Sequence, residues 1–265
     1  MSPIFIHSDL IRSRTLYGNR IQTNDIAGFA RAAHHWLAEE FGPDLIFPAF
    51  NYDFGRTRLL DVNQDPVQVG VLPEYLRTQP EFHRTPVPFF SAIAPFPIPL
   101  DTGEACRPLG QGSVFQWLTE QDGDIVFMGC PIDAMTYIHY AESSLPQGPA
   151  YRYDKTFPGR IKIGDETRPV TCTMHVRPMG VPMDYDFGII ERDLREAKIL
   201  KNLDKKGHVV RAACRDLLDF FLARYQEDPL YGLTQEARNA LAPLTANGAS
   251  RVRIQDFEPA KGEDA

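Results

Sequence analysis

Two short apolar runs separated by an amphipathic segment constrain the fold of this chain more than any other feature. Residues 4–6 (Ile-Phe-Ile) and 45–47 (Leu-Ile-Phe) have the composition of short buried strands. Between them, apolar residues from Ile26 to Leu37 follow the 3.6-residue period of a helix, which we expect to begin at a Thr23-Asn24 cap and to stop at Gly42-Pro43. A strand, a helix and a strand in this order predict a crossover and a parallel strand pair.

Proline restricts the next part of the chain. The sequence has 22 prolines, and they are concentrated between Pro80 and Pro108. Because proline fixes φ and lacks an N–H group, this stretch cannot form a regular helix or a central strand. We expect an ordered loop with one short strand over residues 89–94. Long loops in compact domains are commonly functional, so we expect this one to shape a substrate pocket.

The last third of the chain has a different sequence pattern, typical of hairpins. Residues 162–166 (Lys-Ile-Gly-Asp-Glu) are typical of a hairpin turn, and residues 170–176 alternate like an antiparallel strand. A second hairpin over 199–213 and an amphipathic helix over 215–225 follow. The sequence therefore predicts one domain over residues 1–245 and a polar tail over 246–265. Its predicted fold is a three-layer α/β/α arrangement around a mixed, mainly parallel sheet, with antiparallel C-terminal additions.

Composition excludes several classes of function. The net charge of −7 argues against nucleic acid and anionic membranes as partners and is compatible with a cationic substrate such as an amine. The N-terminus lacks the features of a signal peptide, and no apolar run approaches the ~20 residues of a membrane span. The four cysteines are widely spaced and have neither metal-ligand nor redox spacing: Cys106, Cys130, Cys172 and Cys214. We therefore expect a cytoplasmic protein without a metal site.

A row of polar residues gives the strongest functional signal. An apolar strand over residues 125–128 ends at Gly129, and Asp133 is a good helix N-cap. Thr136, His139 and Glu142 then recur every three residues, which places them on one face of a helix. Histidine titrates near neutral pH and suits general base catalysis. The alternative is a structural histidine with Glu142 as its surface partner.

Five segments of the chain, taken together, form a second pattern. In chain order they are Ile6-His7-Ser8-Asp9-Leu10, residues 47–54 (Phe-Pro-Ala-Phe-Asn-Tyr-Asp-Phe), residues 84–94 (Arg-Thr-Pro-Val-Pro-Phe-Phe-Ser-Ala-Ile-Ala), residues 112–118 (Gly-Ser-Val-Phe-Gln-Trp-Leu) and the Asp133–Glu142 motif. Together they resemble the aminoglycoside 3-N-acetyltransferase family, also called the antibiotic N-acetyltransferase family. The resemblance spans residues 4–225. Each piece alone is weak evidence, whereas five in order are specific.

The resemblance implies a reaction and a set of residues. Members of the family acylate an amine with acetyl-CoA or another acyl-CoA, without an acyl-enzyme intermediate. The implied catalytic residues are His139 as general base, with Asp133 and Glu142. The implied contacts to acyl-CoA are Ser8, Arg84, Ser91, Ser113 and Thr136. From their positions in the sequence, we also expect the amine substrate to contact Asp53, His175, Asp184 and Asp186. Backbone N–H groups near Asp133 are expected to polarise the thioester carbonyl, and the helix start at Ser113 to hold a pyrophosphate.

Each of these residues also has a simpler explanation. Asp133 is accounted for by helix capping, and Thr136 by local bonding within the helix. Ser8 and Ser113 are accounted for by backbone turns, and Arg84 by a salt bridge that pins a loop. Cys130 lies beside the motif, but an acyl-cysteine route would need a histidine in register with it.

Departures from the family pattern bear on the substrate. Val87 stands where the family has a histidine, and Asp9 replaces a serine. Residues 172–178 are not acidic, although aminoglycoside enzymes have there a carboxylate that partners the histidine. A pocket for a polycation should be rich in acid, so we expect a single-amine substrate, such as an amino sugar, free or nucleotide-linked. A hydrolase that uses His139 to activate water, and a non-catalytic ligand-binding member, are the alternatives. A homodimer is compatible with the sequence.

Overall fold

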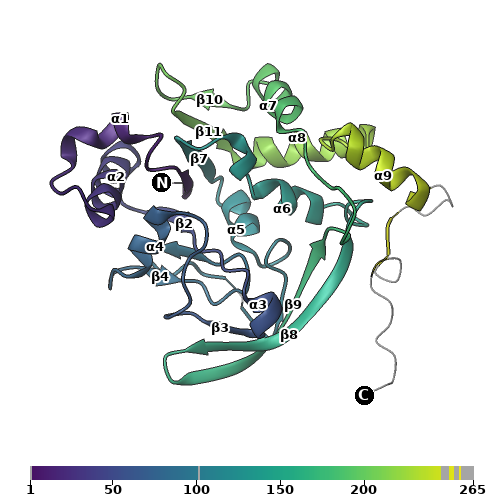
Figure 1. Ribbon diagram of the computed structural model, residues 1–265, viewed down its shortest axis with the longest axis horizontal. Helices are drawn as coiled ribbons and strands as arrows, with labels where there is room; N and C mark the ends of the chain where they lie inside the picture. Colours follow the sequence, from purple (N-terminus) through teal and green to yellow (C-terminus); the bar gives the residue numbers. More distant parts are fainter. Residues whose placement is uncertain (1, 101, 246–250, 254–256, 258–265) are drawn as a thin grey trace.

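The computed structural model describes residues 2–100, 102–245, 251–253 and 257. Within these residues the chain forms a mixed seven-stranded sheet, a second four-stranded sheet and helices on both faces of the first (Figure 1). The larger sheet has the strand order β10-β11-β7-β1-β2-β5-β4. The described part of the chain contains no helix with the length and apolar character needed to cross a bilayer.

The centre of the larger sheet is parallel. Strand β1 (Ile4–Ser8) pairs in parallel with β2 (Leu45–Pro48) on one side and with β7 (Asp124–Met128) on the other. This arrangement confirms the crossover predicted from the first 47 residues. Helix α2 (Ile26–Phe41) makes the connection, and its cap is Asp25 rather than Thr23-Asn24, because the Asp25 carboxylate accepts a hydrogen bond from the Gly28 N–H at 2.6 Å.

Antiparallel strands extend this centre at both edges. The predicted C-terminal hairpin supplies β10 (Lys201–Asn202) and β11 (Val209–Ala213), and β11 pairs with β7. The proline-rich stretch supplies β4 (His83–Arg84) and β5 (Ala92–Ala94) on the other edge. The α/β fold with a mixed sheet and antiparallel additions is therefore confirmed.

Each face of the sheet has its own core, which makes three layers. Side chains alternate along β1, so Ile4 and Ile6 pack on the side of α2 and α4 (Val71–Arg77), whereas Phe5 packs on the opposite side. The helices on the opposite side are α5 (Val114–Glu120), α6 (Tyr137–Ser143), α7 (Phe187–Glu196) and α8 (Cys214–Glu227).

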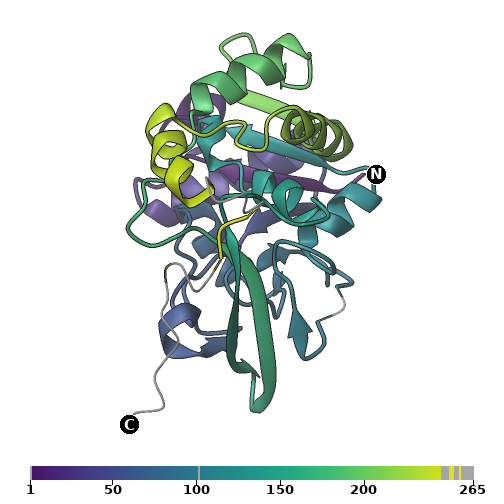
Figure 2. The ribbon, with the colours of Figure 1, turned by 90° about the vertical axis from the view of Figure 1, so that its right-hand side faces the viewer.

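The second sheet is built on a long hairpin. Strands β8 (Tyr153–Ile163) and β9 (Glu166–Val176) pair along their whole length and turn at the predicted Gly164-Asp165 position. Short strands β3 (Leu59–Asp61) and β6 (Ala105–Cys106) flank them. Figure 2 shows this hairpin reaching away from the larger sheet. The remaining helices are α1 (Arg14–Tyr17), α3 (Phe54–Thr57), α9 (Gln235–Thr245) and a 3-10 turn over Gly18–Arg20.

The motif segment is not one continuous helix, and here the prediction is wrong. A 3-10 turn covers Ile132–Ala134, and α6 begins only at Tyr137. Met135, between the two pieces, leaves the helical region (ψ 85°), so the turn and α6 cannot join. Asp133 therefore lies inside the 3-10 turn and does not cap α6. Thr136 occupies the cap position but its side chain makes no capping hydrogen bond.

Gly129 sets the direction of the chain between β7 and this turn. Its φ of +70° is a left-handed conformation that favours glycine. A Cβ at this position would also lie 2.7 Å from the Ser13 nitrogen. The close approach of the segment after β1 thus requires glycine here and brings the turn beside the end of β1.

Candidate active site

A cavity of about 470 Å³ lies where the parallel strands end. The end of β1 contributes His7 and Ser8, the segment after β2 contributes Phe50, and the chain after β7 contributes Asp133 to Thr136. In open α/β sheets ligands bind beyond the carboxyl ends of the strands, where this cavity lies.

A second cavity, of about 630 Å³, adjoins the first. It is lined by residues 174–177, at the end of the hairpin, and by residues 183–185 and 187. Six residues line both cavities: Tyr52, Phe90, Asp133, His139, Tyr185 and Phe187. His139 is thus accessible from two hollows, which is the arrangement that a reaction between two molecules needs.

His139 and Glu142 form a hydrogen-bonded pair within α6. The His139 Nδ1 lies 2.9 Å from the Glu142 Oε2, as the three-residue spacing predicts. The His139 side chain is 26% exposed, whereas that of Glu142 is 1% exposed. Glu142 is therefore not a surface partner but a buried carboxylate that orients the imidazole.

Three further groups converge on the Glu142 carboxylate. The hydroxyl of Tyr151 donates to Oε1 at 2.5 Å, and the hydroxyl of Tyr185 donates to the same oxygen. The Arg152 guanidinium forms an ion pair with Oε2, with Nε at 3.1 Å. Tyr151 and Arg152 come directly before β8, and Tyr185 comes before α7. Residues far apart in the sequence thus hold one carboxylate.

These contacts keep Glu142 ionised. Burial by itself would raise the pKa of Glu142, but the charge of Arg152 and the charge and hydrogen bond of His139 outweigh burial and lower this pKa to about 2. Burial likewise opposes the charge of Arg152, and the Glu142 carboxylate outweighs it and raises the Arg152 pKa. The ionised Glu142 accepts a hydrogen bond from the Nδ1–H group of His139, which leaves the Nε2 lone pair as the basic position of the ring.

Four other predicted site residues lie at the cavities. Ser8 and Thr136 line the first cavity, and the buried Ser8 Oγ has no hydrogen-bond partner among the described residues. His175 and Asp184 line the second. His175 pairs with Asp154, with Nδ1 and Oδ1 2.5 Å apart, and not with His139. The partner of His139 is thus Glu142, from its own helix.

Ser113 and Ser91 are placed elsewhere. Both residues are buried and line neither cavity around His139. The Ser113 hydroxyl accepts from the Gln116 N–H at 3.2 Å and caps α5, and the Ser91 hydroxyl donates to the Val87 carbonyl at 2.9 Å. Their hydroxyls serve local structure, so the structure offers no contact between them and acyl-CoA in these cavities.

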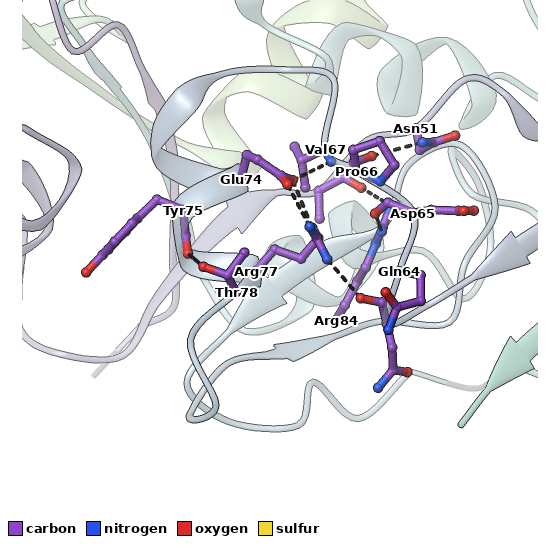
Figure 3. A network of polar contacts seen from close by, with 12 residues as sticks. Asn51, Gln64, Asp65, Pro66, Val67, Glu74, Tyr75, Arg77, Thr78 and Arg84 are labelled. Atoms are coloured by element: carbon purple, nitrogen blue, oxygen red, sulfur yellow. Dashed lines mark hydrogen bonds and ion pairs between the residues drawn. The ribbon is translucent and has the colours of Figure 1, made fainter. Parts of the chain in front are cut away.

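Arg84 also lies away from the site, and Figure 3 shows its surroundings. Its Nη1 donates to the Asp65 carbonyl at 2.6 Å, and its Nη2 to the Ala49 carbonyl at 2.7 Å. Burial lowers the pKa of Arg84 to about 10. The guanidinium thus fastens two loops through their carbonyl groups, and the expected phosphate contact finds no support.

Two predicted substrate carboxylates also fall outside both cavities. Asp186 caps α7, since its carboxylate accepts from the Ile189 N–H at 3.1 Å. Asp53 accepts from the Gln68 side chain at 3.0 Å, at the start of α3. Their neighbours in the sequence, Tyr185 and Tyr52, line the cavities instead.

Sequence reasoning missed Tyr151, Arg152 and Tyr185, and it quoted His7 without assigning it a role. No periodic pattern marks the first three residues, because they belong to connecting segments. A lone Tyr-Arg pair carries no local signal for a partner nine or ten residues away on another element.

Cys130 lines the first cavity, and its chemistry bears on the acyl-cysteine route. Burial raises the pKa of this thiol to about 12. A nucleophilic cysteine reacts as a thiolate, which a raised pKa disfavours. Cys130 is therefore a protonated thiol in the wall of the cavity.

Comparisons with known proteins agree with this fold. The family model for aminoglycoside 3-N-acetyltransferases matches residues 32–226, and the chain belongs to this family. Among characterised relatives, aminoglycoside N(3)-acetyltransferase III of Serratia marcescens is 31% identical over 80 residues, or 29% of this chain. The matched stretch spans only 30% of that relative's length.

Solved structures share the fold over most of the chain. Aminoglycoside acetyltransferase AAC(3)-Xa superposes with a TM-score of 0.65 at 21% identity, over 85% of this chain and 86% of the other. AAC-IIIb, crystallised as a binary complex with CoASH, gives a TM-score of 0.64 at 18% identity, over 85% and 90% of the two chains. At such identities the likeness establishes the common fold.

Proposed function

We propose that this protein is an N-acyltransferase that moves an acetyl or larger acyl group from coenzyme A directly to an amine, with His139 as general base. The observation that carries the proposal is the His139–Glu142 pair at the junction of two cavities. Family membership supports acyl-CoA as the co-substrate, as does the CoASH complex of AAC-IIIb.

The geometry suggests how the reaction proceeds. An amine attacks a thioester only when its nitrogen carries a lone pair, and Nε2 of His139 removes the proton that the nitrogen loses on attack. Glu142, fixed by Arg152 and the two tyrosines, stabilises the imidazolium that forms. The C–N bond forms, the C–S bond breaks, and the proton passes from His139 to the departing sulfur. A protonated Cys130 fits direct transfer without an acyl-enzyme.

The charges around the cavities favour an amino sugar with few amines over a polycation. Asp133 and Asp184 are the carboxylates available to attract an ammonium group among the residues that line them. Arg152 and Arg177 line the second cavity as well, and their charges would repel a molecule with several ammonium groups. Ser8 and Thr136 are the polar residues placed to contact acyl-CoA in the first cavity.

Thiol release from acetyl-CoA tests this function. The purified protein should release CoASH with an amino sugar, such as glucosamine or a nucleotide-linked amino sugar, and more slowly with a polyamine aminoglycoside. His139→Ala should lower kcat by about 10²–10⁴-fold, the usual contribution of a general base.

The chain provides a matched control. His35 and Glu39 form an exposed pair at the same 2.9 Å on α2 and line neither cavity, so His35→Ala should keep full activity. CoASH release without any amine, dependent on His139, would establish the hydrolase instead. Unchanged transfer by His139→Ala would reject the role of this base.

A further inference from the structure

His7 is a buried imidazole in the wall of the catalytic cavity. It is the penultimate residue of the central strand β1 and lies on the same face of the sheet as Phe5, the face that α6 covers. The residue is only 5% exposed, and its ring stacks on Phe127 with centroids 5.3 Å apart. His7 lines the same 470 Å³ cavity as His139.

One polar atom of His7 is not accounted for by the described part of the fold. Its Nε2 is buried and has no hydrogen-bond partner within the described residues. Leaving a buried polar group unpaired is energetically costly, so such a group in a native structure requires a ligand or another explanation. Burial also lowers the pKa of His7 to about 4, which keeps the ring neutral at physiological pH. A neutral imidazole still carries one N–H donor.

The acyl transfer of the proposed function requires such a donor. Attack on a thioester places negative charge on the carbonyl oxygen, and hydrogen-bond donors at this oxygen are a major source of rate enhancement. The sequence suggested backbone N–H groups near Asp133 for this task. Those of Ala134, Met135 and Thr136 already donate to carbonyl groups of the same turn, so they are not free for it.

We propose that the neutral imidazole of His7 donates a hydrogen bond to the thioester carbonyl oxygen of acyl-CoA and stabilises its charge in the transition state. The inference rests on the proposed N-acyltransferase function. His7 transfers no proton in this step: the amine proton goes to His139 and the electron pair of the C–S bond leaves with the CoA sulfur. The two histidines thus have different tasks in one cavity.

Substitution by an aromatic ring without a donor isolates this hydrogen bond. His7→Phe keeps the stacking on Phe127, and we expect kcat to fall by about 10²–10³-fold, the cost of losing one oxyanion donor. The KM for acetyl-CoA and its dissociation constant should remain near the wild-type values. His7→Gln, which keeps an N–H donor, should recover part of the loss. If His7→Phe folds poorly, His7→Met serves the same comparison.

His34 provides the matched control. It also has a buried Nε2 without a partner among the described residues, contacts Phe47 and Phe82, and lines neither cavity. His34→Phe should leave kcat unchanged. Full kcat in His7→Phe would overturn the proposal. Weaker acetyl-CoA binding at unchanged kcat would overturn it as well, and would assign His7 to ground-state binding of the CoA arm. Absence of acyl transfer by the wild-type protein would instead reject the proposed function itself.

Discussion

At the scale of single residues, the site depends on a carboxylate that is both buried and charged. Glu142 carries its charge only because Arg152, His139 and two tyrosine hydroxyls surround it. A buried ion pair contributes little net stability compared with apolar packing, but removing one partner leaves an uncompensated charge in the interior. Stability and catalysis are therefore linked through the side chains of Glu142 and Arg152.

Glu142→Gln should destabilise the protein by about 3–5 kcal/mol, since the Arg152 guanidinium then has no counter-charge. The double variant Glu142→Gln/Arg152→Met should be less destabilised than Glu142→Gln alone. The free energy of unfolding in urea measures both. Equal stability of the wild type and Glu142→Gln would contradict the buried pairing.

The same carboxylate predicts a dependence of stability on pH. The folded-state pKa of Glu142 is about 2, below its ordinary value of 4.5, so its contribution to stability is complete above pH 4.5 and is lost as the pH falls towards 2. The unfolding free energy of the wild type should fall more steeply over this range than that of Glu142→Gln. Parallel pH profiles of the two proteins would count against this assignment.

At the scale of elements, capping side chains fix the starts of α5 and α7. Ser113 illustrates the point, because its hydroxyl lies at the start of a helix and accepts from the Gln116 N–H. A helix start can bind an anion or simply be capped. Here the serine is buried and is already engaged in capping.

Ser113→Ala should lower the free energy of unfolding by about 1 kcal/mol, the usual cost of an N-cap. The KM for acetyl-CoA should not change, because Ser113 lines neither cavity around His139. Chemical denaturation and steady-state kinetics separate the two effects. A marked rise in this KM at unchanged stability would return Ser113 to the cofactor site.

At the scale of the whole molecule, the C-terminal segment fastens the chain that carries Tyr151 and Arg152. The Val252 N–H donates to the Ala150 carbonyl at 2.9 Å, and the Val252 side chain is buried. Arg251 donates from Nε to the Arg152 carbonyl at 2.7 Å, and from Nη2 to the Asp154 carboxylate at 2.8 Å. Most of the predicted polar tail lies outside the described residues.

Arg251→Ala should lower kcat by roughly tenfold, because small displacements of the groups that hold Glu142 disturb the alignment of His139. Arg215, a surface arginine of α8 paired with Asp122, provides a control whose change to alanine should have no such effect. Steady-state kinetics of both variants measures this. Equal kcat in both variants would show that the C-terminal segment does not act on the site.

The sequence by itself determined the features that a few neighbouring residues encode. Apolar periodicity specified the crossover through α2, turn chemistry specified the β8–β9 hairpin, and three-residue spacing brought His139 onto Glu142. Such features depend on local backbone geometry, which short-range patterns record.

Tertiary structure alone decided what surrounds that pair. Arg152, Tyr151 and Tyr185 contact Glu142 from connecting segments. The Arg84 guanidinium binds the carbonyl groups of two loops. Asp133 lies in a 3-10 turn and does not cap α6. No local pattern predicts these contacts, because they depend on how distant elements pack and on which polar groups burial forces to pair.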